Sequence, residues 1–323
     1  MTENLFIIGA GIWGSALAIA LSNQYKKIFL YTHSKTEFQT LCHNNKHPLL
    51  TTKFNNNIQL TTDINVIKKT NAILIAVPSV AFYKVIKQIK PLITQQKIAW
   101  VTKGFDNTTQ LSKIFKDEYQ IDGCIISGPS FALEVSNNKP TALVVASKNE
   151  TLSQYWAKIF QTPFIRSYQN NDIIGVEVGG LVKNSLAIAT GIANGLEFGA
   201  NTQAAIITRG LNEMINLGVA LGAKKNTFMG LSGLGDLTLT CSDNQSRNRQ
   251  FGQYLAKGFN AQESLKKVGS TVEGLEGVNS IIAIAEKLKI EMPICQQVFN
   301  IIKGKTTPKE SVNYLMSRNQ QQE

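Results

Sequence analysis

One lysine stands in a sequence context that suits acid–base chemistry. Helical spacing in the segment 176–191 places four residues on one face, namely Gly180, Lys183, Ala187 and Gly191. A long amine among such small residues is unsuited to a solvated surface, because small residues let another segment or a cofactor approach closely. Burial near other cations would lower the pKa of this amine, so we predict that Lys183 donates and accepts a proton. Asn184 beside it offers an amide to a substrate hydroxyl.

Two downstream segments carry groups that could support such a lysine and hold an anion. A glycine-rich stretch ends at Asp236, whose carboxylate could orient the amine. The triplet Ser246, Arg247 and Asn248 follows, and the planar guanidinium suits a phosphate group while the amide adds a donor. In isolation this triplet would first be interpreted as a helix start with an exposed arginine.

Polar residues also follow two predicted strands. Lys103 comes directly after the apolar run 98–102 and before a glycine, which places its amine at a strand end where ligands bind. Gly128 and Ser130 follow the next run, and a hydroxyl with unpaired N–H groups there could bind cofactor or substrate. A simple strand-to-helix turn is the alternative interpretation of the second segment.

The start of the chain carries a dinucleotide-binding pattern. An apolar run feeds Gly9, Gly11 and Gly14 in G-x-G-x-x-G spacing, followed by a predicted helix over 15–23. The first glycine permits the tight turn, the second lets the backbone approach a pyrophosphate, and the third lets the helix pack on its strand. The helix N-terminus would face the phosphates, although an ordinary flexible turn is the alternative.

The second predicted strand bears on the choice of cofactor. It ends in Thr32-His33-Ser34-Lys35, without the acidic residue that NAD-specific folds place there. We therefore expect NADP(H) to be preferred and NAD(H) to be possible, unless these are simply loop residues. Trp13 could cover the pyrophosphate or the nicotinamide, or it could pack on the helix instead.

The elements that must position these residues form two patterns. Short apolar runs alternate with helical stretches over Phe6–Ile8, Ile28–Tyr31, Ala72–Val77, Ile98–Thr102, Gly123–Ile126 and Thr141–Ala146. This alternation predicts an α/β, Rossmann-like N-terminal domain over 1–172 with a mainly parallel sheet. Residues 173–323 are rich in Ala, Leu, Ile and Gly at helical spacing and predict an all-α domain. A helix over 172–191 should join the two, with the active site expected in a cleft between them, and 317–323 should be a polar tail.

Bulk composition excludes several classes of protein. The chain has 323 residues and 43% hydrophobic content, enough for two cores, without an apolar span of about twenty residues or a signal peptide. Its four cysteines lack C-x-x-C spacing, so we expect no zinc site, no disulfides and a reducing cytoplasm. The net charge of +11 is spread along the chain, which favours a small anionic substrate and cofactor over nucleic acid.

Together these segments closely resemble the bacterial NAD(P)-dependent glycerol-3-phosphate dehydrogenases. The resemblance runs over nearly the whole chain, through Gly9-Ala-Gly-Ile-Trp-Gly14, Thr102-Lys-Gly104, Gly128-Pro-Ser-Phe-Ala132, Leu181-Val-Lys-Asn184, Gly233-Leu-Gly-Asp-Leu237, Ser246-Arg-Asn248 and Val272-Glu-Gly274. It implies the reduction of dihydroxyacetone phosphate to sn-glycerol 3-phosphate, the entry to glycerophospholipid synthesis. It also implies a homodimer. The spread of charge and the lack of a long apolar span lead us to expect no nucleic acid partner and no integral membrane association.

The resemblance also implies roles for individual residues. Catalysis falls to Lys183, Lys103 and Asp236. Cofactor contacts fall to Gly9, Gly11, Ile12, Trp13, Gly14, His33, Lys103, Ala132, Arg247, Thr271 and Glu273. Substrate contacts fall to Lys103, Gly128, Ser130, Lys183, Asn184, Asp236, Ser246, Arg247 and Asn248. Two positions depart from the family pattern, because relatives often place arginine at His33 and an aliphatic residue at Thr271.

Two other hypotheses compete with this function. A related dehydrogenase with a Rossmann and a helical domain could act on a hydroxy acid or a hydroxyacyl-CoA, through a carboxylate or thioester handle instead of a phosphate. A non-catalytic dinucleotide sensor would bind a partner protein, but it would need neither a buried lysine nor a phosphate-binding arginine.

Overall fold

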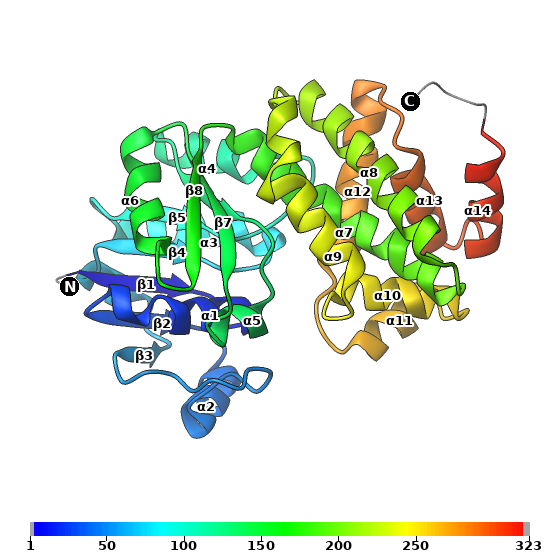
Figure 1. Cartoon of the computed structure of the whole chain (residues 1–323). Coiled ribbons are helices and arrows are strands. Elements are labelled where there is room, and N and C mark those ends of the chain that lie inside the picture. The colour runs from blue at the N-terminus through cyan, green and yellow to red at the C-terminus, as the bar shows by residue number, and fades with distance from the viewer. Residues whose placement is uncertain (1–2, 319–323) are drawn as a thin grey trace. The chain divides into compact units, whose positions relative to one another are not determined.

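The computed structural model describes residues 3–318 and divides the chain into two compact units, Met1–Glu177 and Val178–Glu323. In Figure 1 the first unit runs from blue to green and the second from green to red. The division falls inside the long helix α7 (Ile173–Gly195), whereas the sequence placed it at residue 172, just before this helix.

Unit 1 is built on a single eight-stranded sheet. Its strands are β1 (Asn4–Ile8), β2 (Lys27–Tyr31), β3 (Ile58–Thr61), β4 (Ala72–Ile75), β5 (Lys97–Trp100), β6 (Cys124–Ser127), β7 (Thr141–Ala146) and β8 (Ile165–Asn170). They lie in the order β3-β2-β1-β4-β5-β6-β7-β8, and every neighbouring pair is parallel except β6 with β7. The predicted, mainly parallel sheet is confirmed, and β3 and β8 are additional edge strands.

The helices of unit 1 connect these strands. They are α1 (Ile12–Ala20), α2 (Lys35–Asn44), α3 (Ser79–Ile89), α4 (Leu111–Tyr119), α5 (Ala132–Ser136) and α6 (Glu150–Phe160), with 3-10 turns at Ser22–Gln24, Ile64–Lys69 and Lys90–Leu92. The first helix was predicted over 15–23 and this was wrong. It begins at Ile12 because extended Gly11 is its N-cap, and it ends at Ala20 ahead of the first 3-10 turn.

Unit 2 is helical throughout its described residues, as predicted. Its helices after α7 are α8 (Ala200–Ala220), α9 (Asp236–Ser242), α10 (Arg247–Ala256), α11 (Ala261–Val268), α12 (Glu273–Leu288), α13 (Pro293–Ile302) and α14 (Pro308–Met316), with a 3-10 turn at Lys225–Met229 and a π turn at Leu231–Gly235. Of the predicted tail, residues 319–323 lie outside the described part of the chain. Arg318 forms an ion pair of 2.6 Å with Glu291.

Helix α7 forms the centre of unit 2 and contacts α10 backbone to backbone. A Cβ built at Gly191 would lie 2.0 Å from the carbonyl oxygen of Arg249, and one at Gly252 would lie 2.2 Å from that of Ile188. The small residues predicted to admit another segment therefore do so at Gly191. The helix is long and apolar enough to cross a membrane, but 94% of its apolar window is buried, so it is a core helix.

Candidate active site

The glycine turn after β1 fits a dinucleotide pyrophosphate. Gly9 has φ of +109°, and a Cβ there would lie 2.5 Å from the carbonyl oxygen of Ala76 at the end of β4. A Cβ at Gly14 would lie 1.9 Å from Gly9 O, so α1 packs directly on the turn. At Gly11 a Cβ would meet no described atom within 4 Å, and no described side chain caps α1. A ligand anion can therefore reach the N–H groups at this helix start.

The residues around this turn are only partly covered by protein. Ile12 and Trp13 are half-buried and pack against the hydrophobic core of unit 1. Packing is therefore observed for Trp13, and its contact with a cofactor stays a prediction. His33 is exposed just beyond β2.

A carboxylate does reach the end of β2, which the sequence reasoning missed. Buried Thr32 donates its hydroxyl to the carboxylate of Glu37, from the first turn of α2. The Ser34 hydroxyl accepts from the Glu37 N–H at 3.2 Å, while the Ser34 N–H donates to the Thr32 hydroxyl at 3.1 Å. The Ser-x-x-Glu spacing of a capping box was the available signal for a glutamate turned back toward the strand end.

Unit 1 brings three of the predicted site residues together at the ends of β5 and β6. The Lys103 amine donates to the Gly128 carbonyl at 3.3 Å, and the Ser130 hydroxyl donates to the same oxygen at 3.1 Å. Gly128 has φ of +137°, and a Cβ would lie 3.1 Å from Ala142 O, so glycine is required. Ala132, the first residue of α5, is half-buried nearby in sequence. The segment after β6 therefore does more than form a turn, because the Gly128 carbonyl accepts a hydrogen bond from Lys103.

Unit 2 places Lys183 against a carboxylate and a hydroxyl. Its Nζ lies 2.5 Å from Asp236 Oδ1 and 3.0 Å from Thr240 Oγ1, with side-chain exposures of 8% for the lysine and 1% for the aspartate. The Thr240 hydroxyl donates to the Asp236 carbonyl at 2.6 Å, so its lone pairs face the amine. The carboxylate and the amine therefore form a buried ion pair. Thr240 was not predicted, although it lies one turn after Asp236 in α9.

The glycine cluster before Asp236 explains how this pair is held. A Cβ at Gly179 would lie 2.3 Å from Ser232 O, so α7 touches the π turn one helical turn before Lys183. Within the turn, a Cβ at Gly233 would lie 2.2 Å from Phe228 O. Both contacts require glycine, and they fix the start of α9 against the face of α7 that carries the lysine.

The triplet after α9 begins a helix and also fits an anion. Ser246 is the N-cap of α10, and its hydroxyl accepts from the Arg249 N–H at 3.3 Å. The interpretation of Ser-Arg-Asn as a helix start is therefore confirmed, whereas the exposed arginine that came with it is wrong. Arg247, the first helical residue, is half-buried, and Asn248 is buried. A guanidinium at a helix N-terminus combines charge with N–H donors, which suits a phosphate.

A line of four polar groups links α7, α10 and the start of α12. Asn184 Nδ2 donates to the Glu273 carboxylate at 3.1 Å, and Asn248 Nδ2 donates to Asn184 Oδ1 at 3.0 Å. The N–H of Gly274 donates to Asn248 Oδ1 at 2.9 Å. Asn184, a predicted substrate residue, thus contacts Glu273, a predicted cofactor residue. Thr271, just before α12, is exposed.

Comparison with known proteins decides the family. Models of the NAD-dependent glycerol-3-phosphate dehydrogenase N-terminus and C-terminus match residues 4–153 and 172–313. A glycerol-3-phosphate dehydrogenase, NAD(P)+, from Vesicomyosocius okutanii is 54% identical over 100% of this chain and 99% of its own length. A protein of the same name from Ruthia magnifica is 53% identical over the whole of both chains.

The chain belongs to the NAD-dependent glycerol-3-phosphate dehydrogenase family.

A solved structure agrees with this assignment. The glycerol-3-phosphate dehydrogenase of Coxiella burnetii is 40% identical, covers 98% of this chain and 99% of its own, and superposes with a TM-score of 0.94. The resemblance drawn from the motifs is confirmed, as is the expectation of an oxidoreductase that uses NAD or NADP. Which residues contact the cofactor and the substrate stays a prediction in this glycerol-3-phosphate dehydrogenase family member.

Two buried carboxylates lie outside the predicted set. Glu177 accepts from the Ser112 N–H at 2.8 Å and from its hydroxyl at 2.6 Å, at the start of α4. Glu213 accepts from the N–H groups of Ile294 and Cys295 at 2.6 and 3.2 Å, at the start of α13. Burial raises the pKa of each carboxyl to about 7. Both cap helices that are remote in sequence, so they support the fold of this family member.

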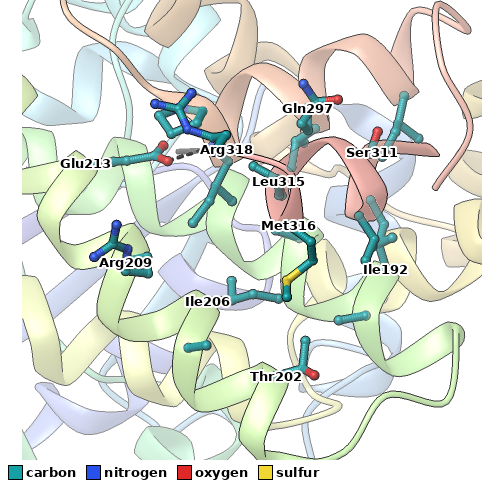
Figure 2. Close-up of a pocket in the computed structure, with 18 of the residues that line it drawn as sticks. Ile192, Thr202, Ile206, Arg209, Glu213, Gln297, Ser311, Leu315, Met316 and Arg318 are labelled. Carbon is teal, nitrogen blue, oxygen red and sulfur yellow. Dashed lines mark hydrogen bonds between the residues drawn. The ribbon is translucent and has the colours of Figure 1, made fainter. Parts of the chain in front are cut away.

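Unit 2 also contains a cavity of about 750 Å³. Figure 2 shows its lining, which includes Ile206, Arg209 and Glu213 of α8 and Ser311 and Leu315 of α14. None of the predicted site residues lines it. Within residues 3–318 no cluster of three His, Cys, Asp or Glu side chains could hold a metal ion.

Proposed function

We propose that this chain reduces dihydroxyacetone phosphate to sn-glycerol 3-phosphate with NAD(P)H, and so supplies glycerophospholipid synthesis. One observation carries the proposal. The buried Lys183 amine, held 2.5 Å from Asp236, lies on α7 beside an asparagine that is bonded to α10, the helix that starts at Arg247. A proton donor and a phosphate-binding helix start are what reduction of a phosphorylated ketone requires.

The residues of unit 2 provide the acid–base chemistry. In the proposed mechanism the bound dinucleotide supplies a hydride to the carbonyl carbon. Lys183 polarises the carbonyl oxygen and gives it a proton, and in the reverse direction it accepts the proton from the alcohol. Asp236 and Thr240 hold the amine in place through their oxygens at 2.5 and 3.0 Å. Lys103 is proposed as a further catalytic residue.

Phosphate binding would fix the orientation of the substrate. Arg247 offers a planar pair of donors, and Ser246 and Asn248 flank it at the start of α10. Gly128 and Ser130 are proposed as further substrate contacts. Correct orientation of a carbonyl toward its reaction partners can lower a barrier by roughly 7–11 kcal/mol, so a substrate that lacks the phosphate should react slowly.

Cofactor binding would rest on the glycine turn. Gly9, Gly11 and Gly14 shape it for a pyrophosphate, and the remaining proposed contacts are Ile12, Trp13, His33, Lys103, Ala132, Arg247, Thr271 and Glu273. We further propose that NADP(H) is preferred and NAD(H) is accepted, because His33 and Lys35 would attract a 2′-phosphate. The Glu37 carboxylate opposes this preference but is engaged by Thr32.

The proposal includes a cytoplasmic homodimer, on the basis of the family resemblance. The distribution of the scattered cysteines supports a reducing compartment, since all four are unpaired thiols. Light scattering coupled to gel filtration tests the dimer, because a monomer would elute with the mass of a single 35.5 kDa chain.

The deciding experiment is a cofactor-oxidation assay with purified protein. NADPH and NADH are each tested with dihydroxyacetone phosphate and with unphosphorylated dihydroxyacetone. Turnover that depends on the phosphate, is abolished in Lys183→Met and is unchanged in the exposed control Lys148→Met supports the proposal. Nucleotide binding without turnover would overturn it, in favour of a hydroxy-acid dehydrogenase first and a sensor second.

A further inference from the structure

We propose that Glu273 is a positioning residue that fixes the two substrate-side amides, Asn184 and Asn248, with their N–H groups toward the substrate phosphate and hydroxyl. The inference rests on the proposed function, since it assigns the amides to that substrate. The observation that carries it is the line of hydrogen bonds that begins at the Gly274 N–H and ends at the Glu273 carboxylate.

The two ends of this line have fixed polarity. The Gly274 N–H can only donate, and the Glu273 carboxylate can only accept. Between them, Asn248 accepts at Oδ1 and donates at Nδ2, and Asn184 does the same. Rotation of either amide by half a turn would place two donors or two acceptors against each other, so each amide has one favourable orientation.

This orientation matters for an anionic substrate. Each amide nitrogen carries two hydrogens, and the line uses one of them. The second N–H of Asn184 and of Asn248 is the donor that each side chain can offer to a phosphate or hydroxyl oxygen. In the rotated orientation the carbonyl oxygens would take its place and repel the phosphate oxygens. Glu273 therefore acts on the substrate through the asparagines.

Burial and close packing make the arrangement rigid. Asn184 and Asn248 are buried, on α7 and α10 respectively. A Cβ at Gly274 would lie 2.8 Å from both Asn184 O and Asn248 Oδ1, so the start of α12 can reach the amides only because it carries glycine there. Since Glu273 and Gly274 are consecutive, the beginning of one helix holds both ends of the line.

Charge gives a test whose sign separates positioning from simple electrostatics. Removing a carboxylate near an anion site should strengthen anion binding if the carboxylate acts only through its charge. Removing the residue that orients the donors should weaken binding instead. Glu276, exposed one turn later on α12, is the matched control because it carries the same charge outside the line.

The experiment compares Glu273→Ala, Glu273→Gln and Glu276→Gln with the parent protein. Affinity for inorganic phosphate is measured by titration calorimetry, alongside the Kd for NADPH, the KM for dihydroxyacetone phosphate and kcat. We expect Glu273→Ala to weaken phosphate binding and raise KM about tenfold, because the lost bond is charge-assisted. Glu273→Gln, which keeps an acceptor oxygen, should recover part of the loss, and Glu276→Gln should bind phosphate as well as the parent does.

Two results would overturn the inference. One is phosphate binding that is equal or tighter in Glu273→Ala, and the other is an effect confined to the Kd for NADPH. Thermal melting of each variant confirms that the compared proteins are folded. Phosphate titration needs no turnover, so a protein that fails to reduce dihydroxyacetone phosphate would refute the proposed function while the order of phosphate affinities still tests Glu273.

Discussion

Asp236→Asn should destabilise the protein by several kilocalories per mole while leaving its shape unchanged. The substitution removes the negative charge 2.5 Å from Lys183 Nζ, at a pair whose side chains are 8% and 1% exposed. Breaking a buried ion pair by neutralising one partner costs about 3–5 kcal/mol, because the remaining charge stays desolvated. That loss is a large fraction of a typical domain stability of about 5–15 kcal/mol.

A double-mutant cycle in urea unfolding measures this cost. Lys183→Met in the Asp236→Asn background removes the stranded charge, so the double variant should regain about 2 kcal/mol or more relative to the sum of the single changes. The exposed pair Lys116–Asp122, at 3.0 Å, provides the control, and Asp122→Asn should cost less than about 1 kcal/mol. Both changes at the buried pair should lower kcat by about a hundredfold or more. Additive effects with a loss below about 1 kcal/mol for Asp236→Asn would refute the reasoning.

Three further predictions concern packing, pH and cofactor choice. Gly252→Ala should lower Tm and destabilise by about 1–3 kcal/mol, because its Cβ would lie 2.2 Å from Ile188 O; an unchanged Tm would contradict the close helix contact. Burial raises the pKa of Glu213 from 4.5 to about 7, so the folded state binds this proton more tightly than the unfolded chain, and stability should fall by roughly 3 kcal/mol as the pH rises through that interval. Urea unfolding at about pH 5 and about pH 8 should show a shallower fall in Glu213→Gln, and an equal fall would reject the assignment. Glu37→Gln should raise the ratio of kcat/KM with NADPH to that with NADH, since it removes the carboxylate bonded to Thr32. An unchanged ratio would show that this carboxylate does not affect the choice between the two cofactors.

Much of the fold could be predicted from the sequence because burial on both sides of a parallel sheet leaves continuous apolar runs. The runs behind β1, β4 and β6 are of this kind, and so is the small-residue pattern of α7. The edge strands β3 (Ile58–Thr61) and β8 (Ile165–Asn170) were missed because β3 has only four residues, two of them polar, and β8 is mostly polar with several exposed side chains. Local pattern alone does not distinguish such segments from loops.

The candidate site was predictable in its residue types and less so in its contacts. Lys183 and Asp236 are separated by many residues, and their pairing depends on a turn that touches α7 at Gly179. The contact of Thr240 with Lys183 could not be predicted, because it depends on the orientation of α9 and a threonine in a helix has no distinctive sequence signal. Glu37 was missed for a related reason, since its side chain turns back to a strand end that lacks an acidic residue of its own.

The reversal of direction between β6 and β7 places carboxyl ends of strands at both ends of the sheet of unit 1. Strands β1, β4, β5 and β6 all end on the side of the glycine turn and Lys103, whereas β7 and β8 end on the opposite side. The exposed residues Lys148 and Asn149, which follow β7 after Ser147, therefore lie at the opposite end of the strands from the glycine turn. A fluorophore or surface tether attached there would leave the glycine turn and Lys103 uncovered, which makes this loop a practical point for immobilising the protein.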